Sequence, residues 1–294
     1  MWSLLVGLWS MEAVAAPVTM GARVEACPIA LYTGSLPRRL VVAQGALHGE
    51  VEATQTALLL RHPKGNYLID GGQRVDLAGS LDGVPAVQRA MLAASAGGFR
   101  PVRPLATAAP TLGPLQGAIL THAHYDHVGG LLEVPGLPIL TTEAELAEAR
   151  RAAAGEATNL LPVDARGLIE RGVAVPFDGP AVGPYPVSHD LYGDGSVILV
   201  PMGGHTPGSL GVFIHTQHDE RVFLVGDTVW VREGYELNLP KSDVAARFDS
   251  DGAATAAQIA TLHDLYREDP GLVLVPAHDG RQWEAAFGDR ACAR

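Results

Sequence analysis

Three histidines and an aspartate follow a short apolar run within six residues, and this cluster limits the folds open to the chain. Residues 117–121 read Gly-Ala-Ile-Leu-Thr, which is typical of a buried strand. In an extended segment, His122 and His124 lie on the same side. Asp126 and His127 then open the following helix, at the carboxyl end of the strand, where α/β folds place ligands. Imidazole and carboxylate are donors that zinc prefers, so the cluster predicts a metal site at a sheet edge.

Three other ligand-type residues each follow a predicted strand and are framed by glycine or proline. His205 comes after residues 196–201, and Asp227 comes after residues 221–225. His278 comes after the predicted strand 272–275. Each residue alone is more often a hydrogen-bonded loop residue than a ligand. Together with the first cluster, the three instead indicate one site built from several strand ends.

The remaining pattern predicts a mixed α/β fold with long loops. Hydrophobic residues make up 47% and charged residues 18% of the 294 positions, which favours a sizeable core in one large or two modest domains. Gly 34 and Pro 21 indicate many turns. Further strands are expected at 39–47, 56–60, 66–70 and 210–215, and helices at 84–96, 143–154 and 253–266. The proline-rich residues 155–190 are either a mobile cover or an ordinary surface loop.

Charge and the two ends of the chain restrict its partners. The net charge of −11 disfavours binding to nucleic acid. Residues 1–16 are largely apolar and end near an Ala-x-Ala pattern, as in a signal segment, but Glu12 interrupts them and no basic residue precedes them. Export and a cytoplasmic location therefore both stay open. No later apolar run reaches the roughly 20 residues that span a bilayer. Cys27 and Cys292 either pair with each other or are two unrelated thiols.

With these motifs in order, the sequence resembles the metallo-β-lactamase superfamily over roughly residues 38–285. The resemblance implies an α/β (α+β) fold, a four-layer αββα sandwich, in a single domain at 38–294 after an N-terminal extension at 1–37. It also implies two divalent metal ions, with zinc as the first expectation. The first ion would take His122, His124 and His205; the second would take Asp126, His127 and His278; Asp227 would bridge both. Asp70, at a strand end, resembles the family aspartate that orients a ligating loop, and otherwise is a turn residue.

The resemblance implies hydrolysis without a serine or cysteine nucleophile. Two divalent ions about 3.5–4 Å apart can share one water, and zinc lowers the pKa of bound water to about 7. The bridging hydroxide would attack an electrophilic carbonyl or phosphorus, with Asp126 and Asp227 as the catalytic carboxylates. Specificity would come from loop-like parts of the chain.

The segment 189–201 and the insertion at 73–110 are similar to the branch of N-acyl homoserine lactonases and organophosphate hydrolases. A small lactone or related ester is therefore the expected substrate. A β-lactamase, a thioesterase or a phosphotriesterase on the same site is the alternative, and a one-iron persulfide dioxygenase stays formally open. A non-catalytic metal-binding protein is a remote alternative, because no ligand is missing. A homodimer is also open.

Two positions depart from the lactonase pattern. Homoserine lactonases commonly carry a tyrosine three residues after the bridging aspartate, and this chain has Trp230 there. Trp230, Tyr125 and Tyr235 are the candidates for a substrate contact. Gly203 also stands where proline is common before Gly204 and the histidine. Both departures concern the substrate and leave the metal assignment unchanged.

Overall fold

The computed structural model describes residues 18–44, 49–81, 84–156, 158 and 160–288. Its first sheet has seven strands in the order β4-β1-β2-β3-β5-β6-β7. Long β1 and β2 pair antiparallel, whereas β3, β5, β6 and β7 run parallel to one another. The strands are β1 Glu25–Pro37, β2 Glu50–Arg61, β3 Tyr67–Ile69, β4 Phe99–Pro101, β5 Gly117–Ile119, β6 Ile139–Thr141 and β7 Gly172–Ala174.

The second sheet has five strands in the order β12-β11-β10-β9-β8. Neighbouring strands are antiparallel except for β11 and β12, which are parallel. Both of these parallel strands therefore end at the same sheet edge, where two of the sequence motifs follow them. The strands are β8 His189–Asp190, β9 Val197–Pro201, β10 Leu210–His215, β11 Arg221–Leu224 and β12 Leu272–Val275.

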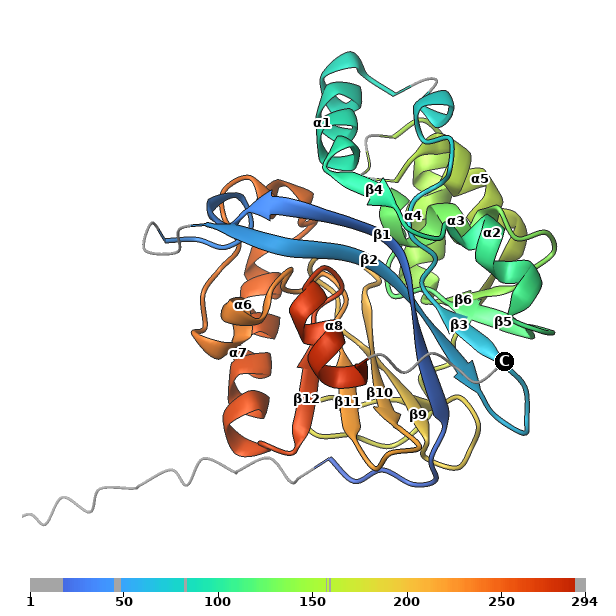
Figure 1. Ribbon diagram of the computed structural model, residues 1–294, viewed down its shortest axis with the longest axis vertical. Coiled ribbons are helices and arrows are strands. Elements are labelled where there is room, and N and C mark those ends of the chain that lie inside the picture. The colour runs from blue at the N-terminus through green and yellow to red at the C-terminus, as the bar shows by residue number, and fades with distance from the viewer. Residues whose placement is uncertain (1–17, 45–48, 82–83, 157, 159, 289–294) are drawn as a thin grey trace, which may run out of the picture.

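Helices cover the two sheets from outside (Figure 1). The helices α2 to α5 lie beside the first sheet, and α7 lies beside the second. The helices are α1 Ala86–Gly97, α2 Leu105–Ala108, α3 Tyr125–Leu132, α4 Glu143–Ala153, α5 Pro162–Arg171, α6 Arg232–Glu236, α7 Gly252–Glu268 and α8 Gly280–Phe287. Short 3-10 turns include η1 Arg38–Leu40 and η4 Ala245–Phe248.

Three buried apolar clusters separate four layers. Successive side chains of a strand point to opposite faces, so Leu59 packs toward α3 and α5 while Leu58 and Leu60 pack toward the second sheet. On the other face of the second sheet, Phe213 and Phe223 stack with centroids 3.8 Å apart and pack against α7. The layers are thus helices, sheet, sheet and helices, which confirms the expected αββα sandwich.

The core between the two sheets can be tested with a pair of matched substitutions. Ile214 is fully buried between the sheets, whereas Ile169 on α5 is 43% exposed. Ile214→Val should lower the free energy of unfolding by about 1 kcal/mol, because it removes one buried methylene group. Ile169→Val should change it by less than about 0.5 kcal/mol. Urea denaturation measures both values, and equal effects would contradict this placement of the core.

The N-terminal part of the fold differs from its prediction. Residues 25–37, assigned to an extension, form β1 and pair with β2 along its whole length. A register shift between Ala30 and Tyr32 interrupts the alternation of buried side chains, which hides the strand from a pattern search. The predicted strand 39–47 is wrong for its described part. Residues 38–40 form η1, and Val41 and Val42 join a small cluster with Val51 and Val231.

The segment 155–190 is more ordered than its prolines suggest. It contains α5 and β7, and Pro162 occupies the first turn of α5, where a proline without an N–H is tolerated. No helix among the described residues is long and apolar enough to cross a membrane. Residues 1–16, for which export and a cytoplasmic location both stay open, lie outside the described residues, as does Cys292, the candidate partner of Cys27.

Candidate metal centre

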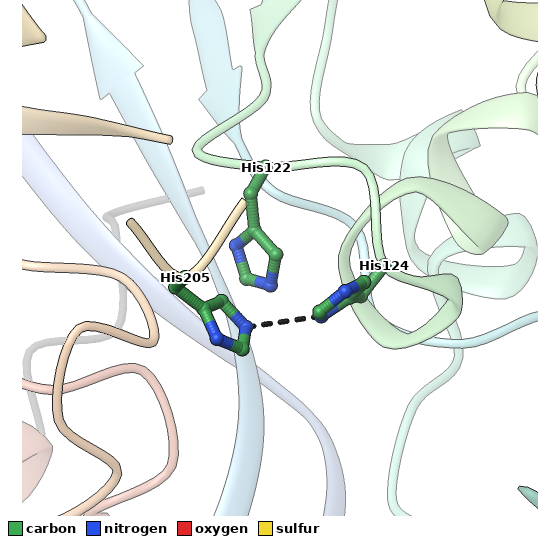
Figure 2. Close-up of side chains that lie close together, drawn as sticks. All are labelled: His122, His124 and His205. Atoms are coloured by element: carbon green, nitrogen blue, oxygen red, sulfur yellow. Dashed lines mark hydrogen bonds between the residues drawn. The ribbon is translucent and has the colours of Figure 1, made fainter. Parts of the chain in front are cut away.

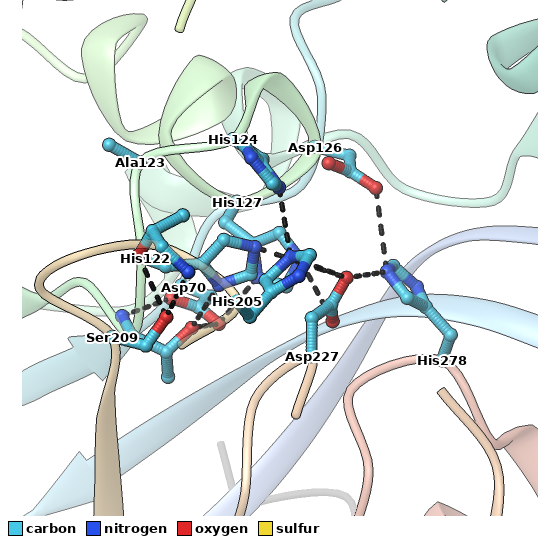
Figure 3. Close-up of polar contacts among 12 residues, drawn as sticks. Asp70, His122, Ala123, His124, Asp126, His127, His205, Ser209, Asp227 and His278 are labelled. Atoms are coloured by element: carbon cyan, nitrogen blue, oxygen red, sulfur yellow. Dashed lines mark hydrogen bonds and ion pairs between the residues drawn. The ribbon is translucent and has the colours of Figure 1, made fainter. Parts of the chain in front are cut away.

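Four loops bring the predicted ligands to one edge of the sandwich (Figure 3). The loops follow β5, β9, β11 and β12, and each leaves a short buried strand. The structure places all seven predicted ligands together, and six are buried, whereas Asp126 is partly exposed. The seven are His122, His124, Asp126, His127, His205, Asp227 and His278.

The seven side chains form overlapping groups, each with ligand atoms within 4.8 Å of one another. His122, His124 and His205 form the first group, and Figure 2 shows their rings turned toward one another. The second group is made by Asp126, His127 and His278. A third group, made by His122, His127 and Asp227, overlaps both. The first two groups contain the same residues as the two sets that the sequence resemblance implies.

Asp227 lies between the first and second groups (Figure 3). Its Oδ2 is 3.2 Å from His278 Nε2 and 3.6 Å from His205 Nε2. Its Oδ1 is 3.4 Å from His127 Nε2, and His122 Nε2 is 3.9 Å from Oδ2. Burial opposes ionisation of Asp227, but His278 and His127 hold its pKa well below the usual range. The central carboxylate is therefore anionic and reaches both groups.

Unpartnered buried atoms show that these residues fit metal ions. Among the residues that the structure describes, the Nε2 atoms of His122, His124 and His127 and the Oδ1 atom of Asp227 are buried without a hydrogen-bond partner. Leaving a buried polar group unpaired costs about 1–3 kcal/mol. These atoms belong to the groups around Asp227, and they are nitrogen and oxygen donors suited to zinc and similar divalent ions.

The electrostatics of the site also suit cations. Burial lowers the pKa of His122 and of His205 well below the ordinary value, and it lowers that of His124 to about 3. Neutral imidazole is the form that binds metal. Burial also opposes protonation of His127, yet Asp70 and Asp227 raise its pKa well above the ordinary value. The same two carboxylates would attract a metal ion to this position.

Asp70, which directly follows β3, fastens both ends of the ligand loop after β5. Its Oδ1 accepts a hydrogen bond of 2.8 Å from Thr121 N. Its Oδ2 accepts from Thr121 Oγ1 and from His127 Nδ1, both at 2.8 Å. Because Nδ1 of His127 donates to Asp70, Nε2 is left facing Asp227. The backbone of Asp70 has φ of +55°, a conformation that aspartate and asparagine adopt more readily than most residues.

Further residues that the sequence did not reveal orient the other histidines. His278 Nδ1 donates to the carbonyl oxygen of Thr54 at 2.9 Å. His205 Nδ1 lies 2.7 Å from Asp249 Oδ1, and Lys241 Nζ lies 2.5 Å from the same oxygen. Asp249 and Lys241 come from loops without a motif, so no spacing signal points to them. Both side chains are nearly fully buried beside His205.

The structure separates the three predicted substrate contacts. The Trp230 ring lies 5.9 Å from the His278 ring and thus borders the site. Tyr125 packs into a small apolar cluster with Leu77 and Leu161. Tyr235 lies in the core beside α7, where its hydroxyl donates to Leu274 O at 3.1 Å. Tyr235 therefore does not join the site, because its side chain points from α6 into the interior.

Comparisons with known proteins agree with this architecture. The family model of the Metallo-beta-lactamase superfamily matches residues 52–278. N-acyl homoserine lactonase AttM of Azorhizobium caulinodans is 25% identical over 231 residues, which cover 76% of this chain and 81% of that protein.

Solved structures have a similar fold. An N-acyl homoserine lactone hydrolase with the product N-hexanoyl-L-homoserine at its catalytic metal center superposes with a TM-score of 0.63 at 17% identity, covering 91% of this chain and 97% of that one. AidC, a dizinc quorum-quenching lactonase, superposes with a TM-score of 0.52 at 15% identity, covering 87% and 90%. At these identities, the likeness shows a shared fold.

Proposed function

The chain belongs to the metallo-beta-lactamase superfamily, and from this premise we propose that it holds two divalent metal ions and opens a lactone or a related ester. Membership confirms the resemblance seen in the motifs and makes the chain a metal-dependent hydrolase. The number of ions, zinc as the metal and the lactone substrate are the parts that we propose.

One observation carries the binuclear proposal: two ligand groups meet at a single carboxylate. In the proposal, one ion takes His122, His124 and His205, and the other takes the second group. Asp227 is shared, since its two oxygens lie within 3.2 to 3.9 Å of histidine Nε2 atoms from both groups. The unpartnered buried nitrogens support the same assignment.

The residues of the chain have separate tasks in this proposal. When bound, two such ions lower the pKa of a shared water and polarise a substrate carbonyl. Asp227 fixes the distance between the two groups. Asp126 Oδ2 lies 3.4 Å from His278 Nε2, and the side chain of Asp126 is 13% exposed, more than that of Asp227 or His278. Its other oxygen, Oδ1, is therefore our candidate for taking the proton that the attacking water gives up and passing it to the leaving oxygen of the opened ring.

Aromatic side chains around the site support a small substrate with an apolar part. Phe99 and Trp230 lie 6.2 and 5.9 Å from the His278 ring, and Phe248 lies 6.4 Å from the His124 ring. All three aromatic residues are partly exposed. Ligand sites usually combine such apolar walls with a few polar groups. The relatives named above act on N-acyl homoserine lactones, which agrees with this choice.

A substrate panel with metal analysis on the same sample tests the proposal. The panel contains an N-acyl homoserine lactone, an aryl ester, nitrocefin and paraoxon. We expect the highest kcat/KM for the lactone, two zinc ions per chain, and loss of activity after chelation. Faster turnover of nitrocefin or paraoxon would contradict the lactone assignment. Two bound ions without turnover of any panel substrate would contradict the lactone and ester assignment.

A further inference from the structure

We propose that Glu145 is a positioning residue that fastens together the two loops carrying the first ligand group. One loop carries His122 and His124, and the other carries His205. The inference rests on the proposed function, because it concerns the metal position that these histidines form. Nothing in the motif pattern includes Glu145, which lies in the first turn of α4, outside both loops.

Glu145 is fully buried at the start of α4. The helix begins after Thr142, whose Oγ1 accepts a hydrogen bond of 3.1 Å from Glu145 N. The same hydroxyl donates to Gly208 O at 2.8 Å. The N-terminal end of α4 is therefore already fixed against the loop that follows His205.

The Glu145 carboxylate bonds to both ligand loops. Its Oε2 accepts a hydrogen bond of 3.0 Å from Ala123 N, the peptide between His122 and His124. Its Oε1 accepts from Gly208 N at 3.0 Å and from the hydroxyl of Thr206, the residue after His205. The Glu145 side chain thus binds the backbone between His122 and His124, and it also binds two groups in the loop that follows His205.

The close fit of this contact depends on Gly208. A Cβ atom at Gly208 would lie 2.0 Å from Thr142 Oγ1 and 2.5 Å from Glu145 N, closer than atoms can approach. The loop after His205 therefore lies directly on the end of α4. A backbone hydrogen bond of 2.9 Å from Leu210 N to Thr121 O also joins the two loops, beyond the ligand residues. Nearer the ligands, Glu145 adds two further links beside the contact of 3.0 Å between His205 Nε2 and His124 Nδ1.

Burying a carboxylate is costly unless hydrogen bonds compensate for it. Glu145 receives three donors, and each comes from one of the two ligand loops rather than from a basic side chain. These three hydrogen bonds therefore all link the Glu145 carboxylate to the two ligand loops. By fixing them, Glu145 would set the distance between the imidazoles before an ion binds, which reduces the ordering that binding requires.

Glu145→Gln tests the proposal with little change in size. The amide has one acceptor oxygen, so if that oxygen serves Thr206 and Gly208, its NH2 group faces the Ala123 N–H, donor against donor. We expect the dissociation constant of the ion at the first ligand group to rise by about 10–100-fold, while the ion at the second group binds as before. Titration of the full chain against a chromophoric chelator measures both constants. The visible spectrum of the cobalt-loaded protein should also change in the bands of one ion.

Two variants separate positioning from general destabilisation. Gly208→Ala keeps the Glu145 carboxylate but pushes the loop away from α4, so it should weaken the same ion selectively. Asp269→Asn is the matched control. Asp269 is also a buried carboxylate, 8% exposed, but it pairs with Arg221 at the opposite end of the second sheet. This control should lose stability and keep both ions at wild-type affinity.

The outcomes distinguish the inference from the proposed function. If the wild-type protein binds two ions and the Glu145→Gln variant binds each of them as tightly as the wild type does, the positioning role is excluded. Equal weakening of both ions would also exclude it, because the effect would then be general. If the wild-type protein holds a single ion, the binuclear proposal fails. In that case, weaker binding of the single ion by the Glu145→Gln variant supports the inference, and unchanged binding excludes it.

Discussion

Asp227→Ala is expected to lower kcat/KM by more than about a hundredfold and to reduce bound metal from two ions toward one per chain. Replacing a residue that only hydrogen-bonds a metal ligand typically costs 10–100-fold. Asp227 lies between both ligand groups, so its loss should exceed that range. Steady-state kinetics with the best panel substrate and elemental analysis of the same preparation measure the two effects.

A matched control distinguishes this result from loss of a buried charge in general. Asp164 on α5 is fully buried and pairs with Arg74 at 2.7 Å, outside the ligand groups. Asp164→Asn should therefore keep two ions and most of the activity. Circular dichroism should confirm that both variants are folded. An Asp227→Ala protein with two ions and the wild-type rate would exclude Asp227 as a shared ligand.

The positions of the candidate metal ligands were predictable because each group of them follows a short apolar strand. His205, Asp227 and His278 lie only three to four residues beyond β9, β11 and β12. A chain leaving a buried strand has little freedom over that length, so the sheet edge nearly determines where these residues lie. The αββα layers were expected from the family resemblance that these motifs carry, and the two sheets with their outer helices confirm them (Figure 1).

The residues that orient the ligands were not predictable in the same way. Asp249 is 44 positions from His205, and Glu145 is 22 positions from Ala123, with no periodic pattern between them. Their contacts depend on how loops pack on one another. The orientation of the Tyr235 side chain was not predictable for the same reason. Its position in the sequence, shortly after Asp227, does not show that α6 turns this side chain into the core. Strand β1 was missed because its register shift breaks the alternation.

Asp70→Asn should raise the dissociation constant of the ion at the second group by about a hundredfold and lower kcat/KM by a similar factor. Asparagine tolerates the positive φ at this position, so backbone strain adds little. Its oxygen can still accept from Thr121 N. The amide NH2 in place of Oδ2 then faces His127 Nδ1, which can no longer donate its proton there. His127 must place the proton on Nε2, the atom that faces Asp227 and the ion.

This effect should lie at the upper end of the range because Asp70 contacts a ligand ring directly, whereas Glu145 contacts two backbone N–H groups and the Thr206 hydroxyl. Chelator titration should show that Asp70→Asn weakens the ion at the second group, whereas Glu145→Gln weakens the ion at the first group. Asp190→Asn is the matched control, since Asp190 accepts hydrogen bonds from the backbone of Tyr192, Gly193 and Gly195 in a loop outside the metal centre. It should lower stability and leave metal affinity unchanged. If Asp70→Asn and Asp190→Asn bind metal equally well, the tautomer of His127 does not depend on Asp70, and this ring must be oriented by Asp227 instead.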